Sequence, residues 1–149
     1  MSDFRIENCD GMHELAKSEL DSVSTYLNKL RDEHRKIITE IHRLRKKGVR
    51  GGTIYKRDGV YAYWNFYIGK KRQRVYLGTD QEKIDRLKDD MARLKKVEDL
   101  DRQANHVFMA INRLAGLLDD ARSTAEAIAT GQMRLDEIQS GRRYHGRRW

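Results

Sequence analysis

Tyrosine and arginine alternate with apolar residues along residues 51–79, which read GGTIYKRDGVYAYWNFYIGKKRQRVYLGT. Successive side chains of a β-strand point to opposite faces of a sheet, so this alternation separates two kinds of chemistry. One face collects the apolar residues Ile54, Val60, Ala62, Trp64, Phe66, Ile68, Val75 and Leu77. The other face, called the Tyr/Arg face below, collects Tyr55, Arg57, Tyr61, Tyr63, Asn65, Tyr67, Arg72, Arg74 and Tyr76. Guanidinium groups pair with phosphates and aromatic rings stack on bases, so the Tyr/Arg face suits a polyanion with stackable bases.

Two turn signals divide this segment into three short strands. Asp58-Gly59 and Gly69-Lys70 are dipeptides that supply the positive φ angles of a two-residue hairpin turn. The sequence therefore predicts a three-stranded antiparallel β-meander over residues 51–79.

The distribution of charge also singles out this segment. The chain has 149 residues and a net charge of +8. Residues 46–76 hold 9 Lys/Arg and 1 Asp/Glu, whereas residues 1–45 and 77–139 carry net charges of −1 and −3. The last ten residues add four arginines and no acid. A cluster of this kind indicates a surface for nucleic acid, an anionic membrane or an acidic protein.

The predicted nucleic-acid-binding residues lie in the sheet and in the C-terminal tail. They are Tyr55, Lys56, Arg57, Tyr61, Tyr63, Asn65, Tyr67, Lys70, Lys71, Arg72, Arg74, Tyr76, Arg142 and Arg143. Two simpler explanations for these residues, without a nucleic-acid ligand, stay open. Tyrosines pair well across strands, and a basic hairpin can be a solvated edge that resists aggregation. A protein partner for the same face is a third. We expect Trp64 and Phe66 to pack in the core instead, because they share a face with aliphatic residues.

Long helices are predicted on both sides of the sheet. Before it, apolar residues recur at alternating spacings of three and four, as in a coiled coil, which predicts a helix over 11–48 after an N-terminal segment 1–10. These residues are Leu20, Val23, Leu27, Leu30, Ile37, Ile41 and Leu44. After the sheet, Thr79 or Asp80 is a good N-cap for a second helix over 80–130. Residues 131–149 are expected to form a short helix and a flexible basic tail. The expected fold class is α+β.

The second apolar seam is predicted to run beyond what the first helix can cover. An apolar stripe without a partner is readily buried against a second copy of the chain, so we expect a homodimer. The alternative is that the short C-terminal helix folds back over this stripe. The predicted interface residues are Val107, Ile111, Leu114, Leu118, Ala121 and Ala125.

The sequence shows none of the motifs that mark common catalytic or metal sites. It has no Gly-rich phosphate loop, Cys-x-x-Cys, His-Glu-x-x-His or serine elbow. We expect a non-enzymatic protein with no cofactor and no metal. Three features favour the cytoplasm. Cys9 is the single cysteine, the N-terminus lacks an apolar signal core, and no apolar run is long enough to span a membrane.

The strand segment resembles the AP2-like, arm-type DNA-binding domain of phage tyrosine recombinases. The matching pieces are GTIYKR at 52–57, the aromatic strand 61–67, GKKRQR at 69–74 and LGT at 77–79. The resemblance implies a sheet that enters the major groove and contacts bases and phosphates with its exposed face and turns. It covers about a fifth of the chain, and no catalytic recombinase domain follows it.

The plan of helix, basic β-meander and helix is similar to that of small uncharacterised phage and mobile-element proteins. This similarity supports the fold and says little about function. From the Tyr/Arg face and the clustered charge we expect a protein that binds nucleic acid, with duplex DNA favoured over RNA, in the cytoplasm of a host cell if it is phage-encoded. The alternative is an anti-defence or inhibitor protein that binds a host protein or complex.

Overall fold

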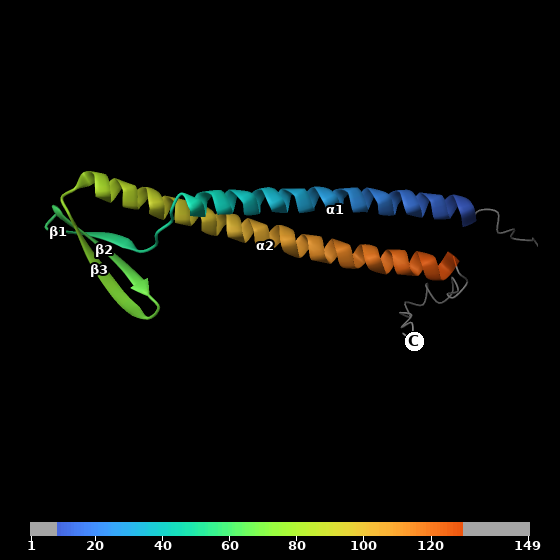
Figure 1. Ribbon diagram of the computed structural model, residues 1–149. Helices are drawn as coiled ribbons and strands as arrows, with labels where there is room; N and C mark the ends of the chain where they lie inside the picture. Colours follow the sequence, from blue (N-terminus) through green and yellow to red (C-terminus); the bar gives the residue numbers. More distant parts are fainter. Residues whose placement is uncertain (1–8, 130–149) are drawn as a thin grey trace, which may run out of the picture. The chain divides into compact units, whose positions relative to one another are not determined.

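The computed structural model describes residues 9–129 and has an α+β fold (Figure 1). Its elements are α1 (Cys9–Lys46), β1 (Thr53–Arg57), β2 (Tyr61–Ile68), β3 (Lys71–Gly78) and α2 (Gln81–Ala129). The predicted order of helix, three strands and helix is confirmed. The short C-terminal helix and the basic tail that were predicted over 131–149 lie outside the described residues.

The three strands form one antiparallel sheet in the order β1-β2-β3. Asp58 and Gly59 both have positive φ (55° and 70°), as the turn prediction requires. The β1–β2 connection is nevertheless three residues long, because Arg57 pairs with Tyr61. Val60, predicted on the apolar face, therefore lies in the turn and is 55% exposed. The second turn is the predicted Gly69-Lys70, since Ile68 pairs with Lys71.

A β-bulge interrupts the β2–β3 ladder near its end. Tyr63 pairs with Tyr76 and Ala62 pairs with Gly78, which leaves Leu77 as the extra residue of β3. Gly78 has a positive φ of 69°, a conformation that favours glycine.

Caps fix both ends of the segment that carries the sheet. Asp80 Oδ1 accepts hydrogen bonds from the backbone N–H groups of Glu82 (3.1 Å) and Lys83 (3.3 Å), so Asp80 is the N-cap of α2. At the other end, α1 stops at Lys46 and Gly48 follows with φ of 98°.

The chain divides into two compact units, and one of them, residues 33–107, contains the sheet. In this unit the C-terminal turns of α1 lie beside α2 (Figure 1). Their shared core consists of Ile41, Leu44, Val97 and Ala104, with Ile37, Ile38, Val49 and Leu100 packed against it. Arg45 pairs with Asp101 at 3.1 Å, and Lys96 approaches Glu40 at 3.9 Å. Hydrogen bonds from Arg43 lower the pKa of the Glu40 carboxyl from its ordinary value, and the positive charges of Arg43, Lys96 and Lys47 add to this effect.

The other unit holds residues 1–32 and 108–149 and contains most of the predicted dimer interface. Ile111 and Leu118 of α2 are 9% and 5% exposed in a single chain, and Leu27 of α1 is 3% exposed. Leu114, Ala121 and Ala125, like Val107 at the end of the sheet-containing unit, are half-buried. Ile111 and Leu118 are therefore shielded within one chain, whereas the other predicted interface residues are only partly covered. The dimer itself stays a prediction.

Within residues 9–129, neither helix combines the length and the apolar character that are needed to cross a bilayer.

Candidate nucleic-acid interface

The strand register brings the tyrosines and arginines to one face of the sheet. Directly paired residues of antiparallel strands lie on the same face. Tyr55 pairs with Tyr63 and Arg57 with Tyr61 across β1 and β2. Across β2 and β3 the pairs are Tyr63 with Tyr76, Asn65 with Arg74, and Tyr67 with Arg72. All nine residues assigned to the Tyr/Arg face from the sequence are therefore on one face.

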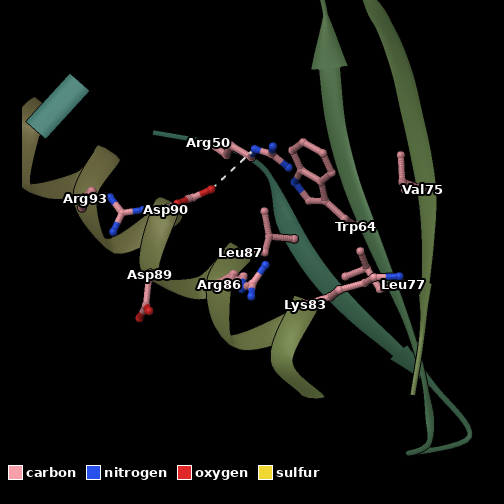
Figure 2. A pocket seen from close by; sticks show the side chains of 10 residues that line it. All are labelled: Arg50, Trp64, Val75, Leu77, Lys83, Arg86, Leu87, Asp89, Asp90 and Arg93. Carbon is pink, nitrogen blue, oxygen red and sulfur yellow. Dashed lines mark hydrogen bonds and ion pairs between the residues drawn. The ribbon is translucent and has the colours of Figure 1, made fainter. Parts of the chain in front are cut away.

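The opposite face packs toward α2. Ala62 is fully buried, and Ile84 and Leu87 in the first turns of α2 are 2% and 4% exposed. Trp64 and Leu77 line the same hollow as Leu87 (Figure 2). By contrast, Tyr55, Tyr61, Tyr67 and Tyr76 are 46–70% exposed. The Tyr/Arg face is thus the more accessible side of the sheet.

Three tyrosines of this face contact one another. Tyr76 lies 6.5 Å from Tyr61 and 5.1 Å from Tyr63 between ring centroids, and the rings are tilted by 39° and 49°. Tilted rings pack favourably but offer no continuous flat platform. The cluster therefore presents ring edges as well as ring faces to a ligand.

Arg74 is held in place by two neighbours on β2. Its Nε donates a hydrogen bond to Asn65 Oδ1 at 3.3 Å, and its guanidinium carbon lies 5.6 Å from the centroid of the Tyr63 ring. Asn65 was predicted to contact nucleic acid directly, but it is only 8% exposed. Because its side chain is buried and hydrogen-bonded, its role in the structure is to orient Arg74.

Most cations of the hairpin have no carboxylate partner. Within residues 9–129, no ion pair forms at Lys56, Lys70, Lys71, Arg72 or Arg74. Arg57 approaches Asp58 at 3.8 Å, and both side chains are largely exposed. Unpaired guanidinium and ammonium groups are available to an anionic ligand at no cost of breaking an existing pair.

Two of the predicted lysines belong to the other face. Lys56 pairs with Ala62 and Lys71 pairs with Ile68, so the register places both on the face that bears Trp64. They were predicted for their charge and not as members of the Tyr/Arg face, and their contact with nucleic acid stays a prediction. Lys70 lies in the β2–β3 turn, and Arg142 and Arg143 lie outside the described residues.

A cluster of charged residues without a predicted role joins the α1–β1 connection to α2. Asp90 is paired with Arg93 and lies 3.5 Å from Arg50, while Arg93 also donates to the Gly48 carbonyl at 2.8 Å. The Arg50 guanidinium lies 5.5 Å from the centroid of the Trp64 ring. These partners are up to 45 residues apart in the chain, so no local pattern could have revealed them.

Trp64 is anchored on this side of the sheet. Its Nε1 donates a 2.8 Å hydrogen bond to the Gly51 carbonyl, and its ring stacks on Phe66 at 4.0 Å between centroids. It is half-buried, so it is a packing residue, although less enclosed than a central core residue.

The described side chains do not form a metal site: within residues 9–129, no group of three or more His, Cys, Asp or Glu residues gathers. Comparisons with family models, with curated proteins and with solved structures found no match to this chain. The resemblance to arm-type DNA-binding domains therefore depends on the sequence motifs alone.

Proposed function

We propose that this protein binds duplex DNA through the Tyr/Arg face of its sheet. The observation that supports the proposal most strongly is the register, which gathers five tyrosines and three arginines on the more accessible face while the apolar face packs toward α2. Duplex DNA offers phosphates for the guanidinium groups and base edges for side chains that enter a groove.

The shape of the β2–β3 hairpin favours a duplex over a single strand. The two strands have eight residues each and carry Arg72 and Arg74 toward a turn that contains Lys70. A two-stranded ribbon of this kind fits the major groove. Single-strand binding depends on bases stacked on open aromatic faces. The tilted packing of Tyr61, Tyr63 and Tyr76 offers less of that surface.

A titration of the full chain with a fluorescent duplex of roughly 25 base pairs tests the proposal. The expected dissociation constant at low salt is micromolar or tighter, by order of magnitude for small modules. Affinity should fall as salt rises, because each neutralised phosphate releases about one counterion. A duplex that fails to bind at low salt would refute the proposal. A single strand of the same sequence that binds more tightly would refute the preference for duplex.

The basic tail needs its own control, because Arg142 and Arg143 are predicted to assist the sheet in binding DNA. The variant R142A/R143A should retain most of the affinity for the duplex. If R142A/R143A loses all affinity while the sheet variant R72A/R74A binds normally, the tail and not the sheet binds DNA.

A further inference from the structure

A groove lies between the apolar face of the sheet and the first turns of α2, and we call it the α2 groove (Figure 2). Its volume is about 520 Å³. Its apolar lining consists of Trp64, Val75, Leu77 and Leu87, and its charged lining of Arg50, Lys83, Arg86, Asp89, Asp90 and Arg93. All of these residues belong to the compact unit 33–107.

The apolar side chains of the α2 groove are only partly covered. Val75 is 41% exposed although it shares a face with the half-buried Trp64. Ile68, at the far end of the same face, is 64% exposed. The first turns of α2 thus cover the Ala62 end of the sheet and leave the other end open to a ligand.

The charges that remain available in the α2 groove are positive. Asp90 is already neutralised by Arg50 and Arg93. The Asp89 side chain points away from the strands (Figure 2). The side chains of Lys83 and Arg86 are 68% and 76% exposed. Among the described residues they pair with Asp80 and Glu82, one turn away, and such exposed helical pairs stabilise a helix only slightly. A carboxylate on a ligand can therefore compete for these two cations.

A nucleotide is a poor fit for the α2 groove. The Trp64 ring is stacked on Phe66 and lies beneath Arg50, so these contacts occupy ring surface that a base would need for stacking. An apolar floor with a rim of both charges is instead typical of protein–protein interfaces.

We propose that the α2 groove binds an acidic segment of a partner protein. An aliphatic side chain of the segment lies against Val75, Leu77 and Leu87, and flanking carboxylates pair with Lys83 and Arg86. The groove is on the face opposite the Tyr/Arg face, so this proposal does not depend on DNA binding.

Selection from a displayed library of short random peptides tests the proposal. The full chain is the bait, and the double variant K83E/R86E is the counter-selection bait. Enriched peptides should combine an aliphatic residue with flanking Asp or Glu. A synthetic copy should give a saturable shift of the Trp64 indole N–H signal in NMR. It should bind K83E/R86E at least tenfold more weakly and V75T several-fold more weakly.

The matched control is K95E/R102E, which reverses two exposed cations elsewhere on α2 and should bind the peptide as the wild type does. Enrichment of basic peptides, no enrichment, or equal loss in both double variants would overturn the proposal. It would also be overturned if duplex DNA shifted the Trp64 signal and K83E/R86E weakened duplex binding. Unchanged duplex binding by K83E/R86E, with loss of peptide binding, would separate the two surfaces.

Discussion

Arg74 of β3 and Asn65 of β2 are register partners, and the guanidinium Nε donates a 3.3 Å hydrogen bond to the buried amide oxygen. This contact leaves the terminal guanidinium nitrogens of Arg74 free for a ligand, because Nε alone is engaged. Asn65 thus acts through Arg74, as a positioning residue.

We expect N65A to weaken duplex binding by roughly 2–10-fold, because ordering one long side chain on binding costs about 0.5–1.5 kcal/mol. The loss should disappear when Arg74 is also replaced by alanine. N105A, at an exposed position of α2, is the control. Anisotropy titrations of N65A, of R74A and of the N65A/R74A double variant measure the coupling between the two residues. An N65A effect that persists in the R74A background would contradict the positioning role.

Removal of the two arginines should act on binding and leave folding intact. R72A/R74A removes two exposed cations that lack carboxylate partners. The slope of log K against log salt should decrease by about two, since about one counterion is released per phosphate contact. The thermal midpoint should stay nearly unchanged, because exposed charges contribute little to stability.

R102A/R113A, which removes two exposed arginines of α2, controls for the change in net charge. If this control reduces the slope as much as R72A/R74A does, the binding surface is not the Tyr/Arg face.

The two faces of the sheet should differ in their tolerance of truncation. W64A removes a ring that stacks on Phe66 and donates a hydrogen bond to Gly51. It should lower the free energy of unfolding by about 2–4 kcal/mol. Y67A removes a side chain that is 70% exposed and should change it by less than about 0.5 kcal/mol. Urea unfolding of both variants checks this difference, and the reverse order would show that the faces are assigned wrongly.

Gly52, directly before β1, should tolerate replacement poorly. It has φ of +106°, and a Cβ there would lie 2.3 Å from the Asn65 carbonyl oxygen and 2.8 Å from Trp64 Nε1. Both the strained backbone and the clash oppose a side chain, so G52A should cost at least about 2–3 kcal/mol. The control is G116A in α2, where nothing lies within 4 Å of the added Cβ and where alanine favours the helix. Equal thermal midpoints for the two variants would contradict the prediction.

Alternation and turn chemistry were sufficient to predict the sheet and its faces. Asp58 and Gly59 adopt the positive φ angles that their residue types favour, and the period-two pattern sorted Tyr63 and Trp64 to opposite faces correctly. The third residue of the first turn was missed, because Val60 continues the apolar alternation although it does not pair. The bulge at Leu77 was missed for a similar reason: one extra residue leaves no mark in a short strand.

Contacts between distant residues were beyond a local reading of the sequence. The burial of Asn65 and the Arg50–Asp90–Arg93 cluster depend on how the α1–β1 connection meets the sheet and α2. Periodicity located the helical seam, including Leu27, Ile41 and Leu44, which are 2–5% exposed. It could not show whether that seam is covered by the same chain or by a second copy, because both alternatives require the same apolar residues.

The last prediction concerns this seam. Ile111 and Leu118 are shielded within one chain, so I111K/L118K should destabilise the fold, by roughly 2–4 kcal/mol for each buried lysine. Loss of helical circular dichroism should accompany this change. M109K/L117K is the matched control, because these neighbouring side chains are 70% and 59% exposed and should tolerate lysine. Sedimentation of the wild type at roughly tens of micromolar, a concentration that populates weak dimers, shows whether this seam also pairs with a second copy. A wild-type dimer that the I111K/L118K variant converts to a folded monomer would instead support the homodimer predicted from the sequence.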